Sequence, residues 1–230
     1  MVDEMMTDDE RAEALKRWFQ ENGAVLVMGV VVGLGGLFGF QWYKDNRENT
    51  LEAASVVYQD VLEALERKDL AEVQALAATL GEDYASSPYE TQALFAAARL
   101  QVDAGDLAAA ASTLEQAIAG EDDASILEVG RSRLARVLLS DERAEDALAL
   151  LDANAPSETF KPRHLELRGD ALHQLGRTEA ARTAYTDALQ VLAGSGTRSS
   201  GALELKLAAL GPAPETDTDV TEAAPADAES

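Results

Sequence analysis

"GDLAAAASTLEQA", residues 105–117, has a counterpart in "GRTEAARTAYTDA", residues 176–188, and this pair of stretches decides the fold. Each copy begins with a glycine, a small residue follows five positions later, and a large residue stands four positions after that. A further small residue lies seven positions before each glycine. In that order, the matching positions are Ala110 and Ala181, Leu114 and Tyr185, and Ala98 and Gly169. A small side chain where two helices cross and a large one between neighbours predict a repeated pair of antiparallel helices.

A third copy, "SDERAEDALALLDA" at residues 140–153, lies between the other two. Its corresponding positions are Ala135, Ala147 and Leu151, with Glu142 in place of the glycine. From Ala147 to Ala181 the spacing is 34 residues, the period of the tetratricopeptide repeat. From Ala110 to Ala147 the spacing is 37 residues, and the insert "GEDDAS" at 120–125 can absorb the extra three. Any alanine-rich helical chain gives chance matches, but three copies in register favour a tetratricopeptide-repeat-like α-solenoid.

Both ends of the repeat region also carry helical patterns. "KDLAEVQALAATL" at 68–80 is a weaker copy, with Val73 at the position of Ala110. "SGALELKLAAL" at 200–210 is predicted to be a helix that covers the last exposed repeat face. We therefore expect one repeat domain over residues 44–210.

The composition agrees with an all-α protein and limits its partners. The 230 residues are 47% apolar but only 5% aromatic, and their formal net charge is −23. So acidic a chain repels a nucleic-acid backbone, so we expect no nucleic-acid partner. The absence of cysteine excludes disulfides and thiolate metal sites.

An apolar stretch, "VLVMGVVVGLGGLFGF" at 25–40, precedes the repeats. No charged residue occurs from Asn22 to Tyr43, and a helix of that length rises about 33 Å, close to the thickness of a hydrocarbon core. A signal peptide would be shorter and end in small residues, whereas this run ends in Gln41, Trp42 and Tyr43. A buried helix of a soluble protein would be amphipathic. We therefore predict a retained transmembrane helix over 22–43, preceded by a cytoplasmic N-terminal tail over 1–21.

Glycine spacing within this stretch predicts a surface for close helix packing. Gly29 and Gly33 form one G-x-x-x-G pattern, and Gly35 and Gly39 form another. The packing partner is either a second copy or a different membrane protein. Three basic residues precede the stretch and two follow it, which slightly favours a cytoplasmic N-terminus.

The C-terminal segment, residues 211–230, contains three prolines, six acidic residues and no basic residue. It cannot bury enough apolar surface to order itself, so we expect a disordered acidic tail.

No pattern of catalytic residues is persuasive. The two histidines, His164 and His173, are nine positions apart, which places them on roughly opposed sides of a helix. Phosphate-loop, zinc-protease and nucleophile-elbow motifs do not occur. We therefore expect no enzyme activity, no metal and no cofactor.

A repeat solenoid without catalytic residues usually holds a protein segment on its concave face. Exposed polar positions on the inner helices are the candidates, and arginines there can pair with ligand carboxylates. The alternative for each is a solubilising surface charge. The candidates are Arg99, Gln101, Arg133, Arg136 and Arg168.

The order of these parts resembles the YfgM family of Gram-negative inner-membrane proteins over about residues 10–210. The stretches that carry the resemblance are "EALKRWFQENG" (13–23), "FQWYKDN" (40–46) and "AASVVYQDVLEAL" (53–65). Within them "KRWF" at 16–19, "ENG" at 21–23 and "YQ" at 58–59 are the most specific. The acidic tail lies outside the resemblance.

The resemblance implies a single-pass inner-membrane protein with a periplasmic repeat domain. Members of the family are ancillary subunits of the SecYEG translocon, act with the periplasmic chaperone PpiD, and help to hand translocated client proteins to folding factors. They are also linked to an envelope stress response regulator. Two readings compete with this one: a membrane-anchored scaffold whose main partner is that cytoplasmic regulator, and an enzyme of unrecognised type.

Overall fold

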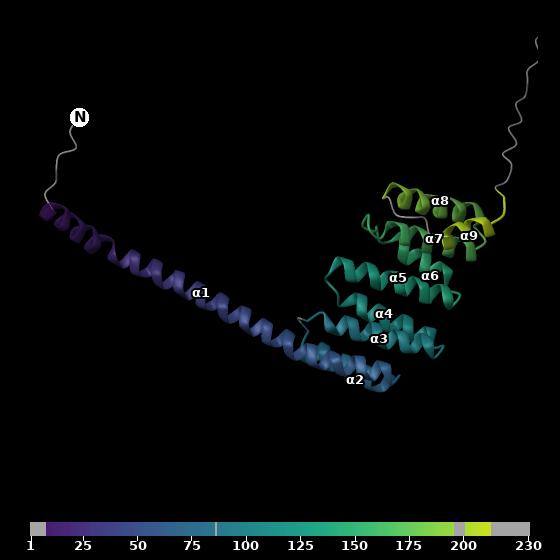
Figure 1. The fold of residues 1–230 in the computed structure, drawn as a ribbon, viewed down its shortest axis with the longest axis horizontal. Helices are drawn as coiled ribbons and strands as arrows, with labels where there is room; N and C mark the ends of the chain where they lie inside the picture. Colours follow the sequence, from purple (N-terminus) through teal and green to yellow (C-terminus); the bar gives the residue numbers. More distant parts are fainter. Residues whose placement is uncertain (1–7, 86, 196–200, 213–230) are drawn as a thin grey trace, which may run out of the picture.

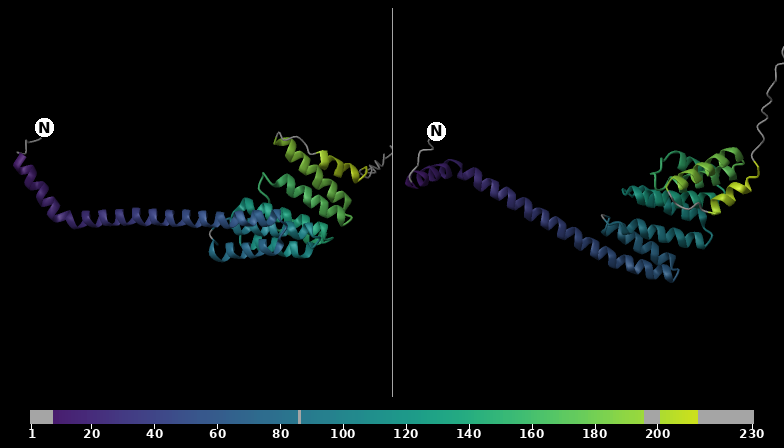
Figure 2. Two further views of the ribbon diagram at one scale, coloured as in Figure 1. Left: turned by 60° about the horizontal axis from the view of Figure 1, so that its bottom comes forward. Right: turned by 45° about the horizontal axis from the view of Figure 1, so that its top comes forward.

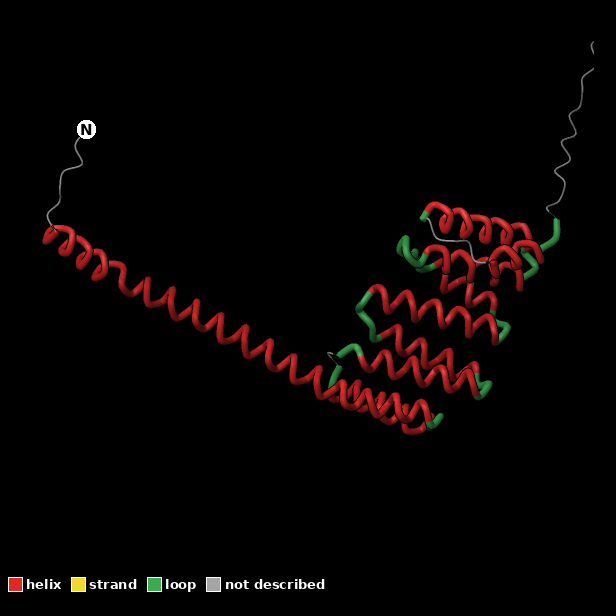
Figure 3. The backbone as a smooth tube through the Cα atoms, viewed as in Figure 1, coloured by secondary structure: helices red, strands yellow, loops and turns green. Residues whose placement is uncertain are grey.

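The computed structural model describes residues 8–85, 87–195 and 201–212. All regular secondary structure within these ranges is helical, which confirms the expected all-α fold (Figure 3). From residue 213 onwards the expected acidic tail lies outside the described residues, as do residues 1–7, 86 and 196–200.

Two helices make up each repeat, and the pairs stack one after another along the chain (Figure 1). The C-terminal part of α1 pairs with α2, α3 with α4, α5 with α6, and α7 with α8, and α9 packs on α8 at the end of the stack. The helices are α1 (Asp8–Glu66), α2 (Leu70–Asp83), α3 (Tyr89–Asp103), α4 (Leu107–Ala119), α5 (Ala124–Ser140), α6 (Ala144–Asp152), α7 (Lys161–Gln174), α8 (Thr178–Gly194) and α9 (Gly201–Ala209).

The turn inside each helix pair has the same backbone conformation. Its middle residue is left-handed in all four pairs: Lys68 (φ 57°), Gly105 (φ 79°), Glu142 (φ 59°) and Gly176 (φ 72°). Glycine adopts this conformation without steric cost, whereas Lys68 and Glu142 are strained by it. Glu142 thus occupies the backbone geometry that glycine has in its neighbours.

Buried small and large residues alternate through the stack. All nine positions expected from the repeat pattern to pack helices together are buried: Ala98, Ala110, Leu114, Ala135, Ala147, Leu151, Gly169, Ala181 and Tyr185. The tightest approach is at Gly169 on α7, where an added Cβ would lie 2.3 Å from Cε1 of Tyr185 on α8. Only glycine leaves room there for the tyrosine ring.

Helix α1 extends far beyond the stack (Figure 2). Its C-terminal part packs on α2 and α3 and buries Ala54, Val61 and Ala64. Farther towards the N-terminus its large apolar side chains are exposed, for example Phe38 at 72% and Trp42 at 71%. The expected domain boundaries at residues 21/22 and 43/44 both fall inside this helix.

The apolar segment of α1 does not form a straight span. Among the described residues, no single helix is both long and apolar enough to cross a membrane on its own. The segments Leu15–Val25 and Val27–Glu66, which meet at a 45° bend, satisfy the criterion as a pair.

Candidate functional site

A hollow of about 560 Å³ opens between the first helices of three successive repeats. We call it the groove. The residues that line it come mainly from α1, α3 and α5, with two leucines from α4: Tyr58, Leu65, Gln92, Phe95, Ala96, Ala98, Arg99, Val102, Leu107, Leu114, Arg133, Arg136, Val137 and Ser140.

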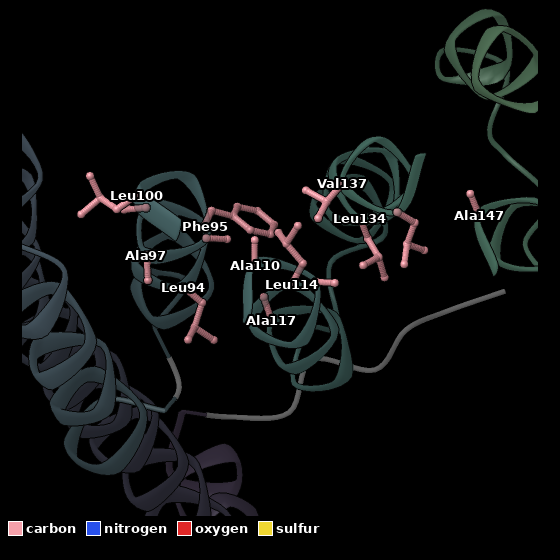
Figure 4. Close-up of a cluster of buried hydrophobic side chains, with 14 of the residues drawn as sticks. Leu94, Phe95, Ala97, Leu100, Ala110, Leu114, Ala117, Leu134, Val137 and Ala147 are labelled. Carbon is pink, nitrogen blue, oxygen red and sulfur yellow. The ribbon is translucent and has the colours of Figure 1, made fainter. Parts of the chain in front are cut away.

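The groove exists because the first helices of the repeats are unevenly spaced. Helix α1 packs against α3, and α5 packs against α7, but α3 and α5 are not among the closely packed helix pairs. Side chains bridge the wider gap. Phe95 extends from α3 towards Val137 of α5 (Figure 4), and an added Cβ at Gly130 of α5 would lie 3.3 Å from the Phe95 ring. The floor of the groove is therefore apolar and aromatic.

Arg133 covers the Phe95 ring, with its guanidinium carbon 4.4 Å from the ring centroid. This distance is within the range of a cation–π interaction. Burial, together with the positive charge of Arg136, lowers the pKa of Arg133, while Tyr58 acts in the opposite direction. Arg133 is thus an incompletely solvated cation beside a second cation.

The charges of the groove are unbalanced. Its lining contains Arg99, Arg133 and Arg136 but no aspartate or glutamate. Within the ranges 8–85, 87–195 and 201–212, none of these three arginines forms an ion pair. This surplus of positive charge occurs in a chain with 42 acidic and 19 basic residues.

Tyr58 forms part of the groove wall on α1. Its ring stacks on Tyr89 of α3 at a centroid distance of 5.1 Å, and burial raises the pKa of its phenol, with a further contribution from Tyr89. Together with Gln92 and Ser140, Tyr58 supplies hydroxyl and amide groups to an otherwise apolar lining. Such groups form hydrogen bonds with peptide groups, and arginines bind carboxylates.

Arg99, Arg133 and Arg136, three of the five residues expected on a partner-binding face, lie together in the groove. Arg168 does not: its Nε lies 2.8 Å from Oδ1 of Asp152. Gln101 was expected to be exposed, and this expectation is wrong, because the side chain is only 4% exposed. Gln101 is three residues after Ala98 and so shares its buried helix face.

The sequence interpretation missed the aromatic residues of the groove. Phe95 precedes Arg99 by one helical turn, a spacing that places both on one face and could have linked them. No such signal existed for Tyr58, because its place in the groove depends on α1 acting as the first helix of the first repeat.

The stack beyond the groove, which we call the C-terminal half (α7, α8 and α9), has a different electrostatic character. Lys206 of α9 lies 2.7 Å from both Glu166 and Asp170 of α7, and Arg163 lies 2.8 Å from Glu166. Asp170 also accepts a 2.8 Å hydrogen bond from the hydroxyl of Tyr185. Burial, this hydrogen bond and the Asp170 charge raise the pKa of the Tyr185 phenol.

The glycines of the apolar stretch meet no other part of the described chain. A Cβ added at Gly29, Gly33, Gly35 or Gly39 would have no neighbour within 4 Å. Among the residues whose placement is described, no group of three or more histidines and carboxylates could hold a metal ion.

Residues 16–212 match the family model described as a tetratricopeptide repeat-like domain. A protein of Escherichia coli (strain K12) named ancillary SecYEG translocon subunit is 31% identical over 178 residues, which cover 77% of this chain and 85% of the relative. Proteins of the same name from Haemophilus influenzae and Neisseria gonorrhoeae are each 24% identical, over 80% of this chain and 89% and 88% of their own lengths. The chain belongs to the YfgM family. The family match begins at residue 16, so it includes most of α1 as well as the repeats.

Proposed function

We propose that the chain is a membrane-anchored protein-interaction module of the bacterial inner membrane, an ancillary subunit of the SecYEG translocon that helps to pass translocated proteins to periplasmic chaperones. One observation carries the proposal: a single helix, α1, joins an exposed apolar segment directly to a repeat stack with an open groove. The names of the relatives support the assignment to the translocon.

The exposed apolar segment supports the anchor. Valines, leucines and aromatic residues between Val25 and Tyr43 are mostly exposed, and leaving such side chains in water costs about 25 cal/mol for each Å² of apolar surface. A lipid bilayer removes this cost. Trp18 and Phe19 on the N-terminal side and Trp42 and Tyr43 on the other suit the two headgroup regions.

The distribution of basic residues supports a cytoplasmic N-terminus. Arg11, Lys16 and Arg17 precede the apolar segment, whereas Lys44 and Arg47 follow it, and basic residues accumulate on the cytoplasmic side. In this orientation the repeat stack and its groove lie in the periplasm, where a PpiD-like chaperone and emerging clients are accessible.

The glycine patterns support lateral docking in the membrane. Gly29 and Gly33 lie one turn apart on one face of α1, and their open surroundings allow another helix to approach the backbone closely. A translocon helix is the partner that the proposal assigns to this face.

Co-purification from the native membrane tests the proposal. Full-length protein is extracted in a mild detergent beside a variant that lacks residues 1–47, and the partners are identified by mass spectrometry. We expect translocon subunits and a periplasmic chaperone with the full-length chain only. Recovery of a cytoplasmic regulator alone, or of the chain alone, would contradict the proposal. A reporter fused after residue 210 measures the orientation independently.

A further inference from the structure

We infer that the groove binds extended, acidic peptide segments that place an apolar side chain beside Phe95. The inference rests on the proposed function, because it names the chemistry of the partner that the interaction module holds. Charge complementarity, the composition of the groove and its dimensions support it in turn.

The positive charge of the groove favours a negatively charged ligand. In the lining, Arg133 and Arg136 are separated by one turn of α5, and Arg99 faces the same hollow from α3. Like charges at this spacing repel one another, so the arrangement destabilises the empty protein. A bound carboxylate would remove the repulsion and form charge-assisted hydrogen bonds with the guanidinium groups. An acidic ligand would therefore supply the negative charge that the groove lacks.

The C-terminal half shows what the same chain does with cations that have a structural role. Arg163 and Lys206 each lie within 2.8 Å of a carboxylate supplied by the chain itself, and so does Arg168. Arg131 and Arg177, elsewhere in the described repeats, also form no ion pair, so a missing internal partner is not rare in this chain. The three arginines of the groove differ in that all of them line one hollow that contains no carboxylate.

The composition of the groove selects more than charge. Phe95 and Val137 form an apolar floor beneath Arg133, and Gln92 adds an amide for a peptide backbone. The Ser140 hydroxyl donates to the carbonyl of Arg136 at 2.9 Å, so it adds a hydrogen-bond acceptor only.

Phe95 and Val137 are already mostly buried, but Val102 at the edge of this floor is 38% exposed. A segment with acidic residues alone would leave this apolar surface in water, whereas an interspersed aromatic or aliphatic side chain would cover it.

The dimensions of the groove favour an extended segment. Its lining runs across three successive first helices, α1, α3 and α5. Packed helices lie about 8–10 Å apart and α3 and α5 are farther apart than that, so the groove spans at least about 20 Å, the length of about six extended residues.

Fluorescence anisotropy of a labelled peptide tests the inference on the full chain in detergent micelles. The probe is Glu-Asp-Phe-Glu-Asp-Leu-Glu, and the matched probe carries Gln and Asn in place of Glu and Asp. We expect the acidic probe to bind at least tenfold more tightly than the amide probe. We also expect its affinity to fall between 50 and 500 mM salt, because screening weakens charge pairs.

Two double variants with the same net charge locate the site. Arg133→Gln with Arg136→Gln should weaken binding of the acidic probe at least tenfold. Arg143→Gln with Arg168→Gln removes two arginines that pair with Asp146 and Asp152 outside the groove, and should change the affinity less than twofold. Circular dichroism checks that each variant is folded. Arg136→Glu serves as a single-residue alternative if the groove double variant unfolds.

Two results would overturn the inference: equal binding of the amide probe, or equal loss in both double variants. Binding that appears only after residues 213–230 are removed would support the chemistry of the groove and identify the acidic tail of the chain itself as its occupant. Co-purification with the wild-type chain separates this inference from the proposed function. Translocon subunits that co-purify with a wild-type chain that does not bind the acidic probe would overturn the inference and leave the proposed function standing.

Discussion

The groove and the C-terminal half are built from the same repeat, yet, among the described residues, the basic side chains are unpaired in the groove and several form ion pairs in the C-terminal half. In the groove, Arg99, Arg133 and Arg136 line a hollow that contains no carboxylate, although Arg136 also borders a second hollow with Asp170. In the C-terminal half, Lys206 joins α9 to two carboxylates of α7. The difference distinguishes cations that hold the fold together from cations left available to a partner.

This comparison shows that a basic residue on a repeat surface has no fixed role. Arg99 follows the small residue Ala98 on its helix, and Arg168 precedes the equivalent small residue Gly169, so the sequence presents them as similar. What separates them is Asp152 at the end of α6, which pairs with Arg168 and has no counterpart at Arg99. Pairing within the fold, rather than residue type, decides which arginines can bind a ligand.

The largest loss of stability is expected from a substitution in the C-terminal half, Gly169→Ala. In Gly169→Ala the new Cβ would lie 2.3 Å from the ring of Tyr185, which is 2% exposed and cannot move aside freely. We expect a loss of about 2 kcal/mol in the free energy of unfolding, since overpacking outweighs the better helix propensity of alanine. Urea unfolding of the full chain in detergent, followed by circular dichroism, measures it.

The control for this substitution is Gly120→Ala, where the nearest atom to the new Cβ would be 4.0 Å away. It should change the unfolding free energy by less than about 0.5 kcal/mol. Because repeats depend mainly on their neighbours, Gly169→Ala should also leave probe binding in the groove unchanged. Loss of binding would show that the two halves are coupled.

A smaller effect is expected from Lys206→Met. This change removes the cation between Glu166 and Asp170, so Asp170 loses its ion pair and Glu166 keeps only Arg163. We expect a loss of about 1 kcal/mol at pH 7, since the side chains are partly exposed and solvent screens the pairs. Arg136→Met, which removes a cation without an internal partner, should cost less.

The same pair of variants gives a pH signature. Burial acts to raise the pKa of Glu166, but its hydrogen bond with Lys206 and the charge of Arg163 outweigh it and lower the pKa below the ordinary 4.5. The stabilisation is therefore present above pH 4.5 and is lost as the pH falls through the folded-state pKa. The stability difference between wild type and Lys206→Met should shrink between pH 7 and pH 3. An unchanged difference would argue against the ion pairs as its source.

The smallest effect concerns the turn between α5 and α6, which follows the groove residue Ser140. Glu142→Gly relieves a left-handed backbone (φ 59°) and should stabilise the chain by about 0.5 kcal/mol, after the entropy of glycine is subtracted. The reverse change, Gly105→Ala (φ 79°), should destabilise it by about 1 kcal/mol. Thermal unfolding gives the melting temperature of each variant. If both melting temperatures rise, or both fall, the result would contradict the shared turn geometry.

The repeat register could be read from the sequence because steric limits act locally. Gly169 opposite Tyr185 allows no alternative packing, and the spacing of such pairs fixes which helix faces are buried. Gln101 could have been assigned correctly by the same rule, from its place three residues after Ala98. The groove could not be read in this way. It depends on the spacing between α3 and α5 and on the absence of a carboxylate, both of which are properties of the assembled stack.

The continuity of α1 from Val27 to Glu66 has a geometric consequence. Each residue of an α-helix turns the chain by about 100°, so the angle between the glycine face at Gly29 and Gly33 and the wall of the groove at Tyr58 is set by the number of residues between them. Inserting one residue near Arg47 would rotate the groove by about 100° and raise it by 1.5 Å, whereas inserting seven would nearly restore its direction. A partner that binds the glycine face of α1 therefore also sets the direction in which the groove faces around the helix axis.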